Sequence, residues 1–468
     1  MEKMIPVYEP ATGKILGYVP DMTEEEVRGA IDLAYNALEN IQSMPAHERA
    51  RALRRVAETI RNKKEDLALL LSREIGRPIK SARLIMDRTA SIYELAAQEL
   101  PEVITGDFVP LEAYNYPAGN ERRIAIVKRE PVGVVGAITP FNFPPDSMAH
   151  KVAPALAVGN SVVLKPSREA PLTEIEISKI IKNSGLPEDS LQVVTGDSGI
   201  IGNLMIESEK IALISFTGSS RVGLELAGKA MARGKKVIME LGGSDATIVL
   251  EDANLDAAAR AVSIGRFDYA GQFCNATKRA IVKEDVYEEF LRLLIDNVKK
   301  LKVGDPLLED TDVGPLISSE AVEKMKRFVN DAINSGGRVL YQAQKIPDIG
   351  FYYPPTLIEA PLTAKVWKEE VFGPILPIIK VKSDEEAIKI ANDTEYGLDA
   401  SIFTKDLNRA YKLASKIKAG SVIINDTTRV RFDNLPFGGV KKSGIGREGV
   451  KYTMLEMSET KIIAYNIV

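Results

Sequence analysis

One cysteine and a few carboxylates are the residues best suited to chemistry in this 468-residue chain. Cys274 is the sole cysteine and lies among small residues, in the run Gly271-Gln272-Phe273-Cys274-Asn275-Ala276. Such surroundings can leave a thiol accessible as a nucleophile, although a lone cysteine is also often a small buried hydrophobe. With only two histidines in the chain, an acid or base that works with this thiol is expected to be a carboxylate or a lysine.

Two further polar residues follow apolar runs that are typical of strands. Glu240 comes directly after the run 236–239 and before Gly242-Gly243, where the backbone can approach a ligand closely. A carboxylate there would lie at the carboxyl edge of a parallel sheet, where α/β sites open, and could act as a general base. Asn142 also follows an apolar run and offers a side-chain amide. Taken alone, each is more often an ordinary turn residue.

A third group of residues lies at predicted strand ends, in a turn before a helix, and in one polar loop. A turn into a helix N-terminus can bind phosphate, although the spacing from Gly218 to Gly223 is not the G-x-G-x-x-G pattern. The segment Gly196–Gly202 has a glycine at every third position, but we interpret it as a strand-to-helix loop. The residues of this group are Lys165, Ser167, Arg168, Thr217, Gly218, Ser219, Gly223, Glu370 and Phe372. They become candidates for cofactor binding through the family resemblance given below.

The elements that must position these residues form an alternating series. Apolar runs rich in β-branched residues alternate with helical segments, the runs being 132–138, 161–164, 191–194, 211–216 and 236–239. Strand, helix and strand at this pace predict right-handed βαβ units and a parallel sheet buried on both faces. A second α/β series runs from 246 to 425. We therefore predict two α/β domains with a cleft between them.

Local motifs mark where helices begin and end. Thr23–Glu26 and Thr173–Glu176 both have the capping-box pattern ahead of apolar residues at helical spacing, so each predicts a helix N-terminus. A helical segment from 47 to 75 should stop at Gly76. The charged, alternating segment Glu121–Glu130 predicts an edge strand that could pair with a partner subunit.

Composition excludes several classes of function. Lys plus Arg total 61 and Asp plus Glu total 65, a net charge of −4 that is too balanced for a nucleic-acid surface. No window approaches the roughly 18 continuous apolar residues of a membrane span, and no secretory signal is evident. One cysteine and two histidines poorly supply a metal site, so we expect no metal. The cysteine count fits a reducing, cytoplasmic setting.

Taken in this order and at these separations, the motifs closely resemble the aldehyde dehydrogenase superfamily over essentially the whole chain. The segment Pro436–Gly444 is also similar to the C-terminal signature of that family. The resemblance implies that Cys274 is the nucleophile, Glu240 the general base and Asn142 a donor to the oxyanion hole. Acylating relatives usually lack the carboxylate at Glu240, so hydrolysis of a cysteine thioester to the free acid is implied rather than transfer to coenzyme A.

The same resemblance assigns the parts of a cofactor site. Lys165 would contact the adenosine ribose, while Gly218, Ser219 and the following helix start would receive the pyrophosphate. Glu370 and Phe372 would hold the nicotinamide riboside.

Arg168 departs from the family pattern. NAD-preferring relatives often carry at this position a Glu that binds the ribose hydroxyls, and a carboxylate would repel a 2′-phosphate. Arg168, Lys165 and Ser167 could instead bind that phosphate by charge-assisted hydrogen bonds. We expect NADP to be preferred and NAD to be accepted as well, unless Arg168 points into solvent.

Arg429 and Arg431 lie in the loop that shapes the aldehyde entrance in this superfamily. They favour a short oxygenated or anionic aldehyde, or else they form salt bridges between domains or between subunits. The pattern is most similar to the branch of non-phosphorylating glyceraldehyde-3-phosphate, lactaldehyde and succinate-semialdehyde dehydrogenases. The expected substrate is glyceraldehyde, lactaldehyde or glyceraldehyde-3-phosphate, with succinate semialdehyde or another semialdehyde as the alternative. Phe273 weighs against a phosphorylated substrate, because some phosphate-sugar enzymes have a basic residue there.

The resemblance also implies a domain plan. A Rossmann-like cofactor domain would comprise 1–117 and 132–243, a second α/β domain over 244–445 would be catalytic, and a small β oligomerisation element would combine 118–131 with 446–468. The expected partners are a small-molecule aldehyde and further copies of the chain, in a homodimer or homotetramer. Two functions of other classes stay open here, a cofactor-independent thiol esterase and a catalytically silent binding protein.

Overall fold

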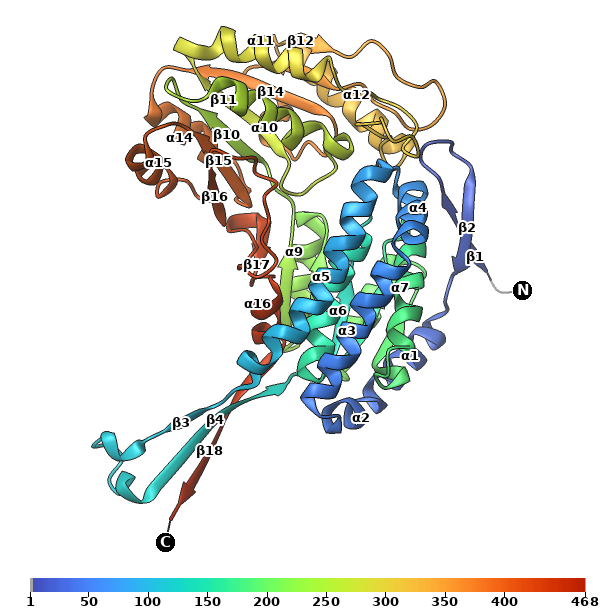
Figure 1. The fold of residues 1–468 in the computed structure, drawn as a ribbon, viewed down its shortest axis with the longest axis vertical. Coiled ribbons are helices and arrows are strands. Elements are labelled where there is room, and N and C mark those ends of the chain that lie inside the picture. The colour runs from blue at the N-terminus through green and yellow to red at the C-terminus, as the bar shows by residue number, and fades with distance from the viewer. Residues whose placement is uncertain (1–2, 468) are drawn as a thin grey trace.

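Two mainly parallel sheets and one projecting antiparallel sheet organise the protein, whose computed structural model describes residues 3–467 (Figure 1). The first sheet has the strand order β17-β9-β8-β5-β6-β7. Its strands are β5 (Val134–Ile138), β6 (Ser161–Lys165), β7 (Leu191–Val193), β8 (Ile211–Thr217), β9 (Lys236–Glu240) and the antiparallel β17 (Gly444–Ile445). The five predicted apolar runs are therefore strands of one sheet, as expected.

Helices cover both faces of this sheet because successive strand residues point to opposite sides. In β5, Val134 packs into a core with the helices of one face, whereas Val135 packs into the core of the other face. The connecting and covering helices are α1 (Glu24–Asn36), α6 (Pro144–Val158), α7 (Leu172–Lys182), α8 (Ser198–Glu207) and α9 (Ser220–Met231). The predicted Rossmann-like arrangement is confirmed.

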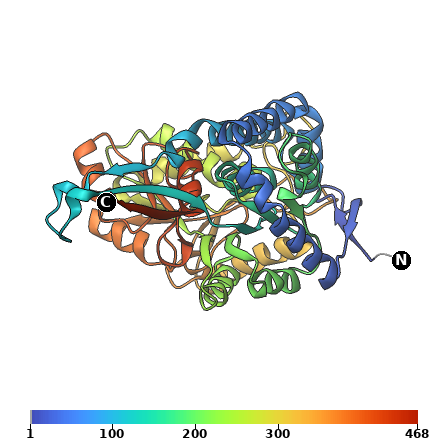
Figure 2. The ribbon, with the colours of Figure 1, turned by 90° about the horizontal axis from the view of Figure 1, so that it is seen from below.

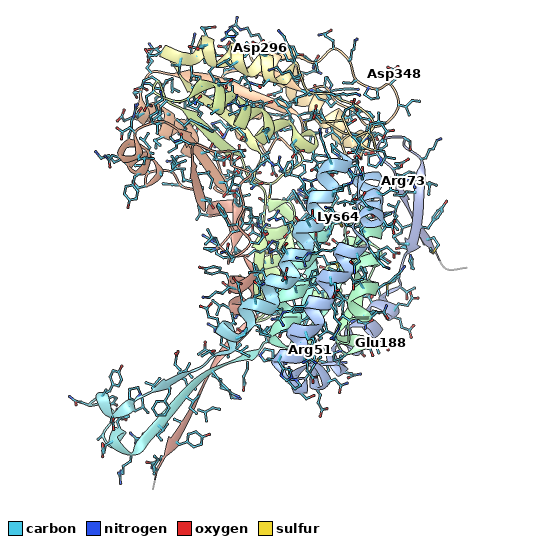
Figure 3. The ribbon with its side chains drawn as sticks, viewed as in Figure 1. Arg51, Lys64, Arg73, Glu188, Asp296 and Asp348 are labelled. Atoms are coloured by element: carbon cyan, nitrogen blue, oxygen red, sulfur yellow. The ribbon has the colours of Figure 1, made fainter. Side chains whose placement is uncertain are left out.

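Four N-terminal helices add an outer layer: α2 (Leu38–Ser43), α3 (Ala46–Asn62), α4 (Lys64–Ile75) and α5 (Ile79–Ile104). The predicted single helix over 47–75 is wrong, since the chain leaves helical geometry at Lys63. Its predicted end is confirmed by Gly76, whose φ of 72° is left-handed. Charged side chains of these helices, such as Arg51, Lys64 and Arg73, point outward (Figure 3). A hairpin of β1 (Met4–Tyr8) and β2 (Ile15–Pro20) precedes them.

The two predicted capping boxes differ in outcome. Thr23 caps α1 as predicted, with its side chain and that of Glu26 bonded reciprocally to the backbone. The prediction at Thr173 is wrong, because α7 begins one residue earlier and Thr173 lies inside it. The buried carboxylate of Glu74, at the end of α4, accepts the N–H groups of Leu172 and Thr173 instead. A residue 98 positions away in the chain thus satisfies the free N–H groups of this helix end.

The second sheet has seven strands in the order β12-β13-β14-β11-β10-β15-β16. Their bounds are β10 (Asp245–Val249), β11 (Thr277–Lys283), β12 (Arg338–Gln342), β13 (Thr356–Glu359), β14 (Ile375–Val381), β15 (Asp399–Phe403) and β16 (Ser421–Ile424). The helices are α10 (Leu255–Phe267), α11 (Tyr287–Val298), α12 (Ser319–Asn334), α13 (Lys365–Lys368), α14 (Asp384–Asn392) and α15 (Leu407–Ala414). This unit is the predicted second α/β series.

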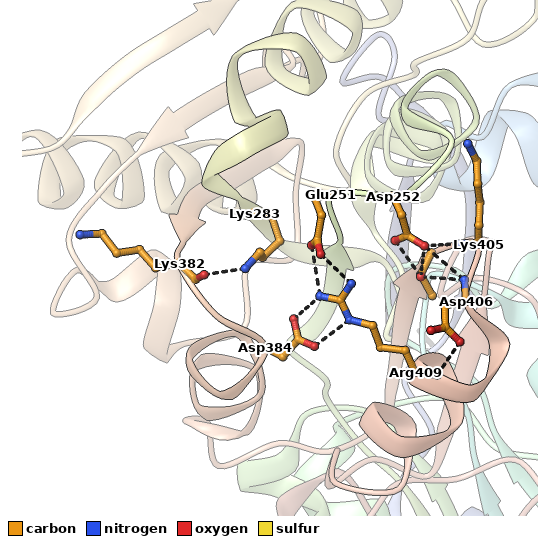
Figure 4. A network of polar contacts seen from close by, with 9 residues as sticks. Glu251, Asp252, Lys283, Lys382, Asp384, Lys405, Asp406 and Arg409 are labelled. Carbon is orange, nitrogen blue, oxygen red and sulfur yellow. Dashed lines mark hydrogen bonds and ion pairs between the residues drawn. The ribbon is translucent and has the colours of Figure 1, made fainter.

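An ion-pair network joins the connections of the second unit (Figure 4). Arg409 of α15 donates from Nε and one terminal nitrogen to Asp384 at 2.8 and 2.6 Å, and its terminal nitrogens donate to Glu251 at 2.7 and 3.1 Å. Asp384 is the first residue of α14, and Glu251 follows β10. One guanidinium therefore ties together two helix starts and a strand end.

The third sheet projects from the body of the molecule, and the C-terminus lies at its outer end (Figures 1 and 2). It consists of β3 (Asp107–Val109), β4 (Arg123–Pro131) and β18 (Ser458–Asn466), and α16 (Val450–Glu456) leads into it. The prediction of an edge strand at Glu121–Glu130 is wrong, because β4 lies between β3 and β18 and pairs with both. Phe108, Ile126 and Ile462 of this sheet are exposed. Of the residues described, no helix is long and apolar enough to cross a membrane.

Candidate active site

A cavity of about 850 Å³ opens at the carboxyl ends of the first sheet's parallel strands and reaches loops of the second unit. In open α/β sheets this edge is where ligands bind. Every residue predicted for catalysis, cofactor binding or substrate binding lines the cavity except Gly223. Residues more than 300 positions apart in the sequence are thereby brought to one place, as the predicted cleft requires.

Cys274 stands on a tightly wound loop between a 3-10 turn (Asp268–Gly271) and β11. Tyr269 and Ala270 have positive φ angles of 45° and 52°, which non-glycine residues rarely adopt, so the loop stores backbone strain. Burial raises the pKa of the Cys274 thiol to about 12, against the lowering effect of Lys278. In the protein without ligands the sulfur is therefore a thiol, and it must lose a proton before it can attack.

Glu240 is the last residue of β9 and is 3% exposed. Among the described residues neither of its carboxylate oxygens has a hydrogen-bond partner. Burial, followed by the charge of Glu448, raises its pKa well above the ordinary value. The glycine at 438 makes room for it, because a Cβ there would lie 2.6 Å from Glu240 Oε1. A buried carboxyl with a raised pKa, in the same cavity as a thiol, is suited to exchange protons with groups in that cavity.

Lys151 and Glu448 are site residues that sequence reasoning missed. Lys151 is fully buried in α6 and its Nζ lies 2.6 Å from Glu448 Oε1. A terminal nitrogen of Arg431 donates to the other Glu448 oxygen at 3.1 Å. Although burial opposes ionisation, Lys151 and Arg431 lower the pKa of Glu448 to about 2, so Glu448 is an anion facing Glu240. The lysine directly before the apolar run 152–158 of α6 was the signal that could have pointed to this group.

Asn142 lies in the loop between β5 and α6 and is 6% exposed. Its amide nitrogen donates to the carbonyl of Gln272 at 2.9 Å, which ties it to the Cys274 loop. An amide nitrogen carries two hydrogens, so one is left for an oxygen bound beside Cys274.

The cofactor candidates line the other end of the cavity. Lys165 ends β6, and its buried Nζ donates to Ser198 Oγ at 2.6 Å. Ser198 lies within Gly196–Gly202, for which the sequence predicted only a connecting loop. Arg168 is exposed at the cavity wall. Thr217, at the end of β8, has a buried hydroxyl without a hydrogen-bond partner among the described residues, as expected of a group that meets a polar ligand.

Gly218 and Ser219 form the turn from β8 into α9. Ser219 is the residue that precedes the helix, so the free N–H groups of α9 face the cavity, as the prediction of a phosphate site requires. Gly223 lies inside α9, where a Cβ would be 2.2 Å from Leu241. This glycine permits close packing of helix on strand rather than ligand contact.

Glu370 and Phe372 approach from the second unit. Glu370 Oε1 accepts the N–H of Gly243 at 3.1 Å, and the Phe372 ring stacks edge-on against Phe141 with centroids 5.9 Å apart. The residues Lys165, Thr217 and Glu370 therefore offer donors and acceptors along one cavity, which fits an extended dinucleotide.

Both candidate substrate arginines line the cavity and also form ion pairs. Arg429 pairs with Asp268 and lies 3.7 Å above the Phe273 ring. Arg431 pairs with Glu448, as described above, and lies 4.0 Å above the Phe437 ring. Arg88 of α5 adds a third guanidinium, paired with Asp433 at 2.6 Å. The substrate end of the cavity is thus lined by cations held in place by carboxylates and aromatic rings.

No group of three or more His, Cys, Asp or Glu side chains within residues 3–467 is arranged to hold a metal ion.

Comparison with known proteins gives concordant matches. The model of the aldehyde dehydrogenase family matches residues 1–463. A lactaldehyde dehydrogenase of Methanocaldococcus jannaschii is 42% identical over 461 residues, which are 98% of this chain and 96% of that protein. A 3-sulfolactaldehyde dehydrogenase of Priestia aryabhattai is 39% identical over 445 residues, covering 95% and 91%. The crystal structure of glyceraldehyde-3-phosphate dehydrogenase GapN from M. jannaschii, complexed with NADP, matches with a TM-score of 0.93 and 41% identity over 100% of this chain and 99% of that one.

Proposed function

Because the chain belongs to the aldehyde dehydrogenase family, we propose that it oxidises a short hydroxyaldehyde to the carboxylic acid through a thioester on Cys274. The family membership confirms the resemblance inferred from the ordered motifs. The proposal depends most on one observation: Cys274, Glu240 and Asn142 line the same cavity as the candidate dinucleotide residues. A thiol esterase or a silent binding protein would not require both sets.

The roles of the catalytic side chains follow from their chemistry. The Cys274 thiolate would attack the aldehyde carbon, and the Asn142 amide, with the Cys274 N–H, would stabilise the resulting oxyanion. NADP, when bound, supplies the hydride acceptor. Glu240 would then accept a proton from the water that hydrolyses the thioester. The raised pKa of Glu240 suits this role, since a base whose pKa approaches the working pH transfers protons efficiently.

We assign the cofactor site to Lys165, Ser167, Arg168, Thr217, Gly218, Ser219, Glu370 and Phe372, with Gly223 in a packing role. NADP is the proposed preference, with NAD also accepted, because Arg168 is exposed beside Lys165 and no carboxylate occupies position 168. Two neighbouring structures are complexes with NADP: the M. jannaschii one and a Bacillus halodurans glyceraldehyde-3-phosphate dehydrogenase with a TM-score of 0.95 and 37% identity.

The proposed substrates are lactaldehyde, glyceraldehyde and glyceraldehyde-3-phosphate, with succinate semialdehyde as the alternative. The names of the relatives support this class, and Arg429 and Arg431 would meet oxygens at the end of the substrate away from the aldehyde. The test is reduction of NADP and of NAD, followed by absorbance, with a panel of these aldehydes. Absence of reduction with every aldehyde would refute the proposed activity.

We further propose a homodimer or homotetramer built through the projecting sheet, in the cytoplasm. Phe108 in β3 and Ile126 in β4 are exposed apolar residues directly opposite each other on paired strands, and association would bury them. The domain plan stays as proposed from the sequence: 1–117 with 132–243, 244–445, and 118–131 with 446–468, of which residues 1–2 and 468 lie outside the described part. Light scattering of the eluting protein gives the number of copies.

A further inference from the structure

Lys278 occupies an unusual place behind the nucleophile. It is the second residue of β11 and is 1% exposed. Its Nζ donates to the carbonyl of Phe273 at 2.8 Å and to the carbonyl of Cys274, and lies 3.4 Å from Glu370 Oε1. One ammonium group therefore contacts both the loop that carries the nucleophile and a side chain assigned to the nicotinamide end of the cavity.

The backbone and side-chain groups around Lys278 are closely packed. A Cβ on Gly243 would lie 2.6 Å from the Cys274 carbonyl oxygen, so the two loops touch. The N–H of Gly243 binds the same Glu370 oxygen that Lys278 approaches. Burying an ammonium group is costly unless its hydrogens are bonded, and here two carbonyls and one carboxylate surround it. A purely apolar residue would fill the volume without these bonds, so the lysine at this position calls for a functional explanation.

Lys278 is one of several charged groups near the thiol. Those facing Cys274 from the surrounding elements are Lys278 of β11, Glu240 of β9, Asp245 of β10, Arg431 of the loop after β16 and Arg88 of α5. Two of these are carboxyl groups that disfavour a thiolate, and Lys278 is the foremost of the cations that favour it. Asp245, Asp399 and Glu370 are the carboxyl groups near Lys278 itself.

We propose that Lys278 is a positioning residue that holds the Cys274 loop and Glu370 together as one unit and places a positive charge at the backbone of the nucleophile. The inference rests on the proposed role of Cys274 as nucleophile. It adds that the cofactor end and the thiol are coupled through a single side chain, so that loss of Lys278 should disturb both.

The chain offers a matched control on the same strand. Lys283 of β11 is 8% exposed, and its Nζ also donates to a backbone carbonyl, that of Lys382. It lies at the far end of the strand and does not line the cavity. Lys283→Met therefore reproduces the loss of a buried lysine–carbonyl bond without touching the site.

The test measures alkylation of the sole cysteine by iodoacetamide as a function of pH. The proteins are wild type, Lys278→Met, Lys278→Gln, Lys278→Arg and Lys283→Met, each full length and checked for a cooperative thermal transition. Modification of Cys274 is followed by intact mass, and the KM for NADP is measured in parallel. The glutamine variant keeps a hydrogen-bond donor but has no charge. If the methionine variant does not fold, the glutamine variant still shows whether loss of the charge slows alkylation of Cys274.

The expected result is about a tenfold lower rate of alkylation at every pH below the midpoint in Lys278→Met and Lys278→Gln, which corresponds to an upward shift of the midpoint by about one pH unit. Their KM for NADP should rise several-fold, because Glu370 loses its cation. Lys278→Arg should restore the midpoint, and Lys283→Met should match wild type in both measurements.

An unshifted midpoint in both neutral Lys278 variants, or an equal shift in Lys283→Met, would overturn the inference about Lys278. Failure of the proposed function gives a different result. If wild-type protein fully alkylated at Cys274 still oxidised aldehydes, the role of the cysteine itself would be wrong.

Discussion

Replacing Glu448 by Gln should lower the pKa of Glu240 and move thioester hydrolysis to more acidic pH. Glu448 is 3% exposed and ionised, and its charge is the largest contribution after burial to the raised pKa of Glu240. Glutamine has the same length and can still accept a hydrogen bond from Lys151. The substitution removes one negative charge and leaves the cations Lys151 and Arg431 facing Glu240.

The size of the shift follows from Coulomb's law. Two unit charges about 8 Å apart interact by about 2 kcal/mol at an effective dielectric constant of about 20, which corresponds to about 1.5 pKa units. Glu240 acts as a base only when ionised. Well below its pKa, a downward shift of one unit or more raises the ionised fraction about tenfold, and hydrolysis should accelerate by that factor. At high pH the rate should fall modestly, because the base is weaker.

The assay is decay of preformed acyl-enzyme, measured as a function of pH. Arg431→Met is the matched control, for which the opposite shift is expected. Because Arg431 lowers the pKa of Glu240, its removal should move the acidic fall in the decay rate to higher pH. Thermal unfolding of both variants checks the fold, since Lys151 loses its buried partner in Glu448→Gln. If the rate of acyl-enzyme decay in Glu448→Gln fell on the acidic side at the same pH as in wild type, or at a higher pH, the electrostatic reasoning would be refuted.

Three further substitutions test separate parts of the account. Glu240→Gln should retain a single burst of reduced cofactor but lose about 10²-fold or more in steady-state turnover, and unchanged turnover would exclude Glu240 as the base. Arg168→Glu should lower the ratio of kcat/KM for NADP over NAD about a hundredfold, as expected for reversal of a charge beside a phosphate, and an unchanged ratio would show that Arg168 points into solvent. Arg409→Met should reduce the free energy of unfolding in urea by about 1 kcal/mol, because its partners are partly exposed, and no change would mean that the network in Figure 4 adds nothing to stability.

The sheets could be predicted because their signal is local. Buried parallel strands need continuous apolar runs, and every run predicted between 132 and 239 is a strand of the first sheet. The misplaced start of α7 has a long-range cause, since the carboxylate of Glu74 supplies the cap that Thr173 was expected to provide. The sequence did not predict the break between α3 and α4 at Lys63, because buried apolar residues such as Ile60 and Leu67 keep helical spacing on both sides of it.

The candidate site could be predicted where motifs lie at strand ends. Cys274, Glu240 and Lys165 are each marked by their neighbours in the sequence, and all three line the cavity. No neighbouring residue in the sequence points to Lys151 or Glu448. Their ion pair joins residues 297 positions apart, so only the folded chain brings them together. Pairing also explains why net charge says little about this cavity, where Arg88, Arg429 and Arg431 each lie against a carboxylate.

The central claim is that aldehyde oxidation passes through a thioester on Cys274, and mass spectrometry of Glu240→Gln tests it most directly. The variant is mixed with lactaldehyde or glyceraldehyde and NADP, quenched in acid after one turnover, and digested. The account predicts an acyl adduct on the peptide that contains Cys274, in an amount equal to the burst of NADPH. A burst of NADPH with unmodified Cys274 would contradict it.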